Sequence, residues 1–145
     1  MFQISKNASY SQGKGEALSR EMKRAKGQIL CVEDDQDSAE MMTALLGLSD
    51  YEVITADSVA EALELARRGG FDLYLLDNWL KDGTGVELCQ QIRSFDSRTP
   101  ILFYSGAAYD SDIKQAMNAG AQGYMVKPSS LENLATTISR LVRKT

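Results

Sequence analysis

The chain has no histidine, only two cysteines and two prolines, and no apolar run longer than a few residues. Without histidine, and with Cys31 and Cys89 far apart and in no CxxC pair, it offers neither a zinc site nor a disulfide framework. Both thiols are expected to be reduced and buried. The apolar runs are too short to span a membrane, and the first residues lack the apolar centre of a signal peptide. We therefore expect a cytoplasmic protein without membrane insertion.

A chain of 145 residues, 43% hydrophobic and 25% charged, has the length and composition of one globular domain. Its net charge of −4 is unevenly distributed, because residues 1–26 carry six basic side chains against two acidic ones. We expect 1–26 to be a basic N-terminal extension, disordered or forming a short helix, and 27–145 to be the folded domain. The folded part is acidic and would repel DNA or RNA, so direct nucleic-acid binding is not expected.

From Gln28 onward, short β-rich runs alternate with amphipathic helical segments, a pattern typical of a parallel sheet covered by helices on both faces. The predicted fold class is therefore α/β, a doubly wound (βα)5 protein. The predicted strands are about 28–32, 51–55, 72–76, 100–104 and 123–126. The predicted helices are about 37–46, 58–68, 84–94, 110–119 and 130–143. Ser58 is the expected N-cap of the second helix, and Gly47 is expected to end the first.

Polar side chains follow four of these strands where each strand ends. In chain order they are Glu33 and Asp34, then Asp77, Ser105 and Lys127. In open α/β sheets, ligands bind outside the carboxyl ends of the strands, at the point where the strand order reverses. We therefore expect these acids, this hydroxyl and this amine to meet in one crevice, with a flexible loop following Asp77.

Three carboxylates in one crevice indicate that a cation binds there. Two carboxylates about 4 Å apart repel by about 4 kcal/mol at an effective dielectric constant near 20, so Glu33, Asp34 and Asp77 would need a positive partner. Mg²⁺ accepts carboxylate, carbonyl and water oxygens, commonly together with a phosphate. A carboxylate can also act as a nucleophile and form an aspartyl phosphate. The pattern thus favours metal-assisted phosphoryl transfer to Asp77.

The motifs, taken in order, resemble the receiver domain of response regulators, the phosphoacceptor module of two-component signalling. The motifs that carry the resemblance are residues 29–35, Leu75-Leu76-Asp77, residues 82–88, Ser105-Gly106 and residues 120–128. The resemblance covers the chain except its N-terminal extension. It implies a flavodoxin-like sheet with strand order 2-1-3-4-5.

The resemblance also implies a role for each site residue. Asp77 would be the phosphoacceptor, and Asp34, Asp77 and the main-chain carbonyl of Trp79 would bind Mg²⁺, with Glu33 acting through water. Lys127, aimed by a cis peptide bond to Pro128, and the hydroxyl of Ser105 would contact the phosphoryl oxygens. Ser105 and Tyr124 would form the conformational switch.

The implied function is reception of a phosphoryl group from a histidine kinase or a histidine phosphotransfer protein, because the chain has no histidine that could serve as its own donor. It would not be an enzyme beyond its own phosphorylation and dephosphorylation. Since no output domain is expected after the last helix, the signal would pass to a downstream protein, most simply through the face formed by the fourth helix, the fifth strand and the fifth helix.

The sequence departs from the family pattern at three positions. Lys81 stands where proline is usual, Ser129 follows Pro128 where an aromatic residue is frequent, and Trp79 is large for a position beside a phosphate. The first two put the rigidity of the site loops in question. Trp79 is predicted to slow loss of the phosphoryl group by crowding the attacking water.

Three other classes of protein have features in common with this pattern. Phosphatases of the haloacid-dehalogenase type also use an aspartyl nucleophile after a strand, but they carry a second aspartate two residues later, where this chain has Trp79. A flavodoxin-like nucleotide or flavin binder needs a loop of N–H donors after the first strand, where this chain has residues 33–37, rich in acids. A degenerate receiver, acting as an unphosphorylated protein-interaction module, stays open as the first alternative function, and an aspartyl-nucleophile phosphatase as the second.

Overall fold

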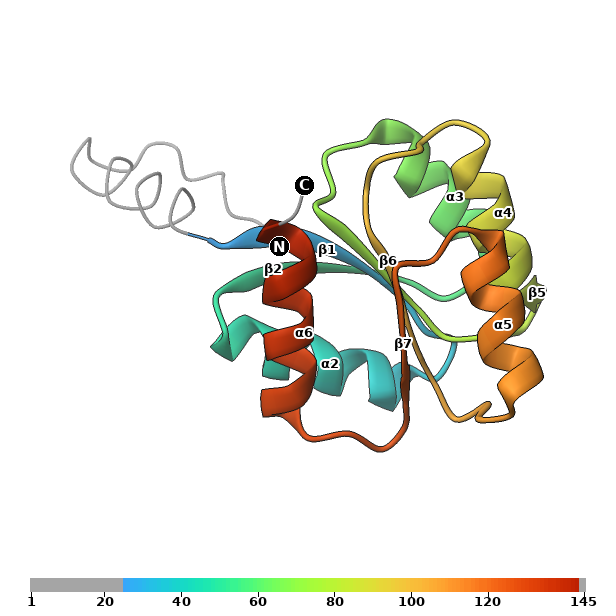
Figure 1. Cartoon of the computed structure of the whole chain (residues 1–145). Helices are drawn as coiled ribbons and strands as arrows, with labels where there is room; N and C mark the ends of the chain where they lie inside the picture. Colours follow the sequence, from blue (N-terminus) through green and yellow to red (C-terminus); the bar gives the residue numbers. More distant parts are fainter. Residues whose placement is uncertain (1–24, 144–145) are drawn as a thin grey trace.

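The computed structural model describes residues 25–143; nearly all of the predicted basic extension lies outside the described residues. Residues 27–126 contribute a five-stranded sheet with the order β2-β1-β3-β6-β7, in which every neighbouring pair is parallel (Figure 1). The strands are β1 (Gly27–Val32), β2 (Tyr51–Ala56), β3 (Leu73–Leu76), β6 (Ile101–Ser105) and β7 (Gly123–Val126). Renumbered along the chain, this is the predicted order 2-1-3-4-5, and the prediction is confirmed.

Helices cover both faces of the sheet (Figure 1). They are α2 (Gln36–Leu48), α3 (Val59–Arg68), α4 (Gly85–Arg93), α5 (Asp110–Ala119) and α6 (Leu131–Arg143). Helices α2 and α6 lie on one face, and α3, α4 and α5 lie on the other. Each face has its own buried apolar cluster, which is why a sheet of this kind reads as continuous apolar runs.

Alternation along the strands assigns side chains to these two clusters. In β1, Ile29 and Cys31 pack toward α2 and α6, whereas Leu30 and Val32 pack toward the other three helices. All four are nearly inaccessible to solvent. The thiols of Cys31 and Cys89 are free and buried, as predicted. Burial raises the pKa of the Cys31 thiol to about 12, so it stays protonated at neutral pH.

Side chains cap the first turns of α2 and α3. Ser58 accepts a hydrogen bond from the amide of Glu61, which confirms it as the N-cap of α3. Helix α2 begins earlier than predicted, at Gln36. Asp35, the residue before it, is the N-cap, because its carboxylate accepts a hydrogen bond from the Ser38 amide at 2.9 Å. The predicted end of α2 was also wrong. Gly47 lies inside α2, and the chain reverses at Asp50, which takes a positive φ of 71°.

The segment after Asp77, expected to be a flexible loop, forms a small antiparallel hairpin. Strand β4 (Trp79–Leu80) pairs with β5 (Gly83–Thr84), and Lys81 and Asp82 make the turn. Leu80 is buried in the core. Strands of two residues are too short to show an alternating pattern, so the sequence could not indicate them.

Among the described residues, no helix combines the length and apolar character that a membrane span requires.

Candidate functional site

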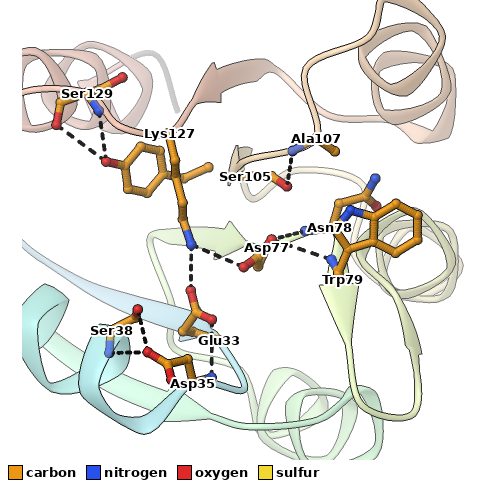
Figure 2. Close-up of polar contacts among 11 residues, drawn as sticks. Glu33, Asp35, Ser38, Asp77, Asn78, Trp79, Ser105, Ala107, Lys127 and Ser129 are labelled. Atoms are coloured by element: carbon orange, nitrogen blue, oxygen red, sulfur yellow. Dashed lines mark hydrogen bonds and ion pairs between the residues drawn. The ribbon is translucent and has the colours of Figure 1, made fainter.

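Four of the predicted site residues lie close together at the carboxyl ends of β1, β3, β6 and β7: Glu33, Asp77, Ser105 and Lys127 (Figure 2). Val32 and Leu76 are register partners in neighbouring strands, so Glu33 and Asp77 emerge side by side. Main-chain hydrogen bonds extend the sheet at this edge, from the Asp77 amide to the Val32 carbonyl and from the Lys127 amide to the Ser105 carbonyl. The topology alone therefore gathers side chains that lie up to 94 residues apart in sequence.

Lys127 bridges the two carboxylates. Its Nζ donates to Oε1 of Glu33 at 2.7 Å and to Oδ2 of Asp77 at 3.1 Å (Figure 2). The Glu33 side chain is 7% exposed and that of Asp77 13% exposed, so both charges are largely removed from water. One ammonium thus balances two carboxylates that would otherwise repel each other.

The site electrostatics follow from this arrangement. Burial raises the pKa of the Glu33 carboxyl, and the hydrogen bond from Lys127 offsets part of that rise. Burial alone would lower the pKa of Lys127, but the Glu33 hydrogen bond and the Asp77 charge outweigh it and raise that pKa. Lys127 is therefore held in its charged form, with three donors available to carboxylate or phosphoryl oxygens.

The other carboxylate oxygen of Asp77 faces main-chain amides. Oδ1 accepts from the Asn78 amide at 2.7 Å and from the Trp79 amide at 3.4 Å. Oδ2 accepts from Nζ of Lys127 at 3.1 Å. Gly85 donates its amide to the Asn78 carbonyl at 2.8 Å, which joins the start of α4 to the residue after Asp77. These contacts fix the orientation of the carboxylate on both sides.

Tyr104 is a site residue that the sequence analysis missed. The Lys127 ammonium lies 5.5 Å from the centre of the Tyr104 ring, and the Tyr104 hydroxyl accepts a hydrogen bond from the Ser129 amide at 3.1 Å. The aromatic group that the family often places after Pro128 is absent here, but a ring from β6 lies near the lysine. The available signal for Tyr104 was its place as an aromatic residue at the end of the apolar run 101–104. That place is equally typical of a strand residue with no role in a site, so the sequence did not single Tyr104 out.

Ser105 is fully buried and connected to Tyr124 through one intervening residue. The Ala107 amide donates to Oγ of Ser105 at 3.2 Å, and the Tyr124 hydroxyl donates to the Ala107 carbonyl at 2.5 Å. The Tyr124 ring stacks on Phe103 with its centroid 5.5 Å away. Burial raises the pKa of the Tyr124 hydroxyl. Ser105 and Tyr124 therefore belong to one connected group at the ends of β6 and β7.

The acidic residues that follow β1 do not all have the same role. Asp35 caps α2, whereas buried Glu33 shares the Lys127 ammonium with Asp77. Asp34, the next residue in the chain after Glu33, is exposed. Within residues 25–143, no three acidic, cysteine or histidine side chains form a metal cage of their own. The carboxylates at this edge are those of Glu33, Asp34 and Asp77, and main-chain carbonyls follow the same strands. Oxygens of these kinds suit Mg²⁺, which is usually bound through one or two carboxylates.

Comparison with known proteins agrees with this architecture. The family model described as the response regulator receiver domain matches residues 29–139. The nisin biosynthesis regulatory protein NisR of Lactococcus lactis subsp. lactis is 33% identical over 117 residues, which are 81% of this chain and 51% of that protein. A two-component response regulator from Clostridium difficile superposes with a TM-score of 0.78 at 28% identity, covering 82% of this chain and 98% of that one.

A CheY-like receiver domain from Methanospirillum hungatei JF-1 gives the same TM-score at 27% identity, over 81% of this chain and 94% of the other. The chain belongs to the response regulator receiver family. Receiver domains are signalling modules of two-component systems and are generally not enzymes. The chain spans about half the length of the curated relatives it matches.

Proposed function

We propose that this protein is a phosphoacceptor in a two-component system or phosphorelay, phosphorylated on Asp77. The observation that carries the proposal is the contact of Lys127 with both Asp77 and Glu33, in which a half-buried ammonium holds a nucleophile-competent carboxylate next to a second acid. A histidine kinase or histidine phosphotransfer protein supplies the phosphoryl group. The P–N bond to its imidazole breaks as the P–O bond to Asp77 forms.

In this proposal each residue contributes to positioning or to charge. Asp77 attacks with one carboxylate oxygen, while the amides of Asn78 and Trp79 keep the other in place. Lys127 then turns from the carboxylates toward the incoming phosphoryl oxygens, where negative charge accumulates. Tyr104 limits where the ammonium can lie.

Mg²⁺ fits the same set of oxygens. Asp34 and Asp77 would bind it directly together with the Trp79 main-chain carbonyl, and Glu33 would act through water. The ion would neutralise the charge of the transferred group. Addition of acetyl phosphate and Mg²⁺ should therefore label Asp77, and EDTA should prevent the labelling.

Output is proposed to leave through α5, β7 and α6. When Ser105 moves toward the phosphoryl group, the hydrogen bonds from Ala107 to Ser105 and from Tyr124 to Ala107 transmit that motion to the Tyr124 ring. Three large apolar side chains are exposed here: Tyr109 just before α5, Met117 within α5 and Val126 at the end of β7. A downstream protein could contact them. Two states that differ by a few kcal/mol suffice for one covalent modification to reverse their populations.

NMR spectra of the free and beryllofluoride-bound protein test the output. The proposal expects shifts at Tyr124 and along α5. Shifts confined to the loops around Asp34 and Asp77 would instead favour the alternative, a module whose interactions do not depend on phosphorylation.

A further inference from the structure

The turn of the β4–β5 hairpin is joined to the start of α3. This hairpin begins two residues after Asp77, so any contact that holds it also bears on the phosphoacceptor. Lys81 and Asp82 form the turn, and both reach the same short segment, residues 57–60. The segment lies 22–24 residues earlier in the chain, between β2 and the first turn of α3.

Asp82, in the turn of the hairpin, caps the start of α3. Oδ1 accepts from the Val59 amide at 2.7 Å and Oδ2 from the Ala60 amide at 3.1 Å, the first two residues of α3. These amides have no partner within the helix, and a carboxylate there also interacts favourably with the helix dipole. The hydrogen bond from Val59 holds the pKa of Asp82 below its ordinary range. Asp82 therefore stays ionised and attached to α3 at neutral pH.

Lys81 adds an ion pair beside this cap. Its Nζ lies 3.0 Å from Oδ2 of Asp57, and both side chains are more than half exposed. The hydrogen bond that Lys81 donates to Asp57 raises the pKa of Lys81. An exposed pair contributes little to global stability and is screened by salt. Proline, the residue usual at this position in the family, would restrict the backbone through its own ring. Lys81 instead restrains the turn through its ion pair with Asp57.

Close packing leaves the hairpin little freedom to move without losing these contacts. Leu80 is buried in the core, and a Cβ added at Gly83 would lie 3.2 Å from Cγ2 of Val59. Asp57 also lines the groove of about 470 Å³ that contains Glu33 and Asp34. Asp57, the ion-pair partner of Lys81, thus lies on the same surface as two acidic residues of the site.

We propose that Lys81 and Asp82 are positioning residues for phosphorylation, because they clamp the β4–β5 hairpin to α3 and so fix the Trp79 carbonyl and the amides that orient Asp77. This inference rests on the proposed function. Loosening the clamp lowers the rate of labelling and raises the Mg²⁺ concentration needed for half-maximal labelling, while the rest of the fold stays intact.

Charge exchange tests the clamp. The variants are Lys81→Asp, Asp57→Lys and the double exchange, labelled with acetyl phosphate over a range of Mg²⁺ concentrations. Each single variant should label about two- to fivefold more slowly at low salt, the scale of an exposed ion pair. The double exchange should restore the wild-type rate, and the difference between variants should shrink near 1 M salt, where the screening length is about 3 Å.

The pair between Arg68 and Glu64 provides a control, since it is another exposed contact of 3.1 Å, formed within α3 itself and away from the hairpin. Its reversal, Arg68→Glu with Glu64→Arg, should leave labelling unchanged. The sole tryptophan, Trp79, gives a second readout, because acrylamide should quench its fluorescence more in the single variants.

Two negative results are distinguishable. Wild-type protein that takes no label on Asp77 overturns the proposed function, and the positioning role with it. Wild-type protein that labels on Asp77, together with single variants that label at the same rate, overturns the positioning role alone. A double exchange that restores the unfolding temperature but not the labelling rate has the same consequence.

Discussion

The Lys127 ammonium lies over the ring of Tyr104, 5.5 Å from its centre, while its Nζ contacts Glu33 and Asp77. The ring is itself anchored, because its hydroxyl accepts from the Ser129 amide. A cation over an aromatic face gains about 0.5–2 kcal/mol, more as water is excluded. Tyr104 therefore restricts the positions that the Lys127 side chain can take.

Replacement of Tyr104 by leucine should slow labelling of Asp77 by roughly two- to tenfold, since about 0.5–1.4 kcal/mol of positioning is lost. Tyr104→Phe keeps the ring and removes only the contact with Ser129, so it should retain most of the rate. The measurement is the initial rate of labelling by acetyl phosphate. Equal rates in Tyr104→Leu and wild type would show that Lys127 is placed by its carboxylate partners alone.

Gly85 allows the start of α4 to approach Asp77. A Cβ at this position would overlap the Asp77 carbonyl oxygen and lie 2.8 Å from the Phe103 ring. Gly85→Ala should therefore lower the free energy of unfolding by about 1–3 kcal/mol, the cost of overpacking a filled site. It should also slow labelling, because the backbone after Asp77 has to move.

The matched control for Gly85 is Gly47, which lies within α2 and has no atom within 4 Å of an added Cβ. Gly47→Ala should stabilise the protein by about 0.5–1 kcal/mol. Urea unfolding measures both variants. A Gly85→Ala protein as stable as wild type would contradict the close approach.

Asp96 lies at the opposite end of the sheet and makes stability depend on pH. Burial opposes its ionisation, but the amides of Thr99 and Arg98 and the Tyr74 hydroxyl donate to it and together hold its pKa at about 2. Because this is below the value in the unfolded chain, the ionised group contributes stability above pH 4 and loses it as the pH falls through about 2. The contribution is at most about 2 kcal/mol.

Asp96→Asn should therefore reduce stability at pH 7 and flatten the loss between pH 4 and pH 2. Tyr74→Phe, which removes one donor, should bring the acid transition to higher pH. Urea midpoints across this range measure the effect. Parallel curves for wild type and Asp96→Asn would show that other carboxylates govern acid unfolding.

Trp79 is exposed, and its main-chain amide lies 3.4 Å from the Asp77 carboxylate. Water that hydrolyses an aspartyl phosphate must approach in line with the bond to Asp77, and a large side chain at this point should obstruct it. Trp79→Asn should shorten the lifetime of the phosphorylated protein, whereas Trp79→Phe should change it less. A lifetime that is unchanged or longer in Trp79→Asn would place the ring away from the path of the water.

The sequence predicted the parts of this structure that depend on strand ends and apolar periodicity. Asp77, Glu33 and Lys127 were placed together because parallel strands bring their carboxyl ends to one edge. Contacts between elements that carry no periodic signal could not be predicted. The cap from Asp82 to α3 and the ring of Tyr104 against Lys127 depend on how separate segments pack, and nothing local distinguishes these residues from ordinary turn and strand residues.

The central claim is that Asp77 is the residue that takes the phosphoryl group. Aspartyl phosphates are reduced by borohydride to homoserine, so treatment of acetyl-phosphate-labelled protein followed by peptide mass spectrometry locates the acceptor. The account predicts homoserine at position 77 alone, formed only with Mg²⁺ and lost in Asp77→Asn. Homoserine at another aspartate, or phosphorylation that persists in Asp77→Asn, would contradict it.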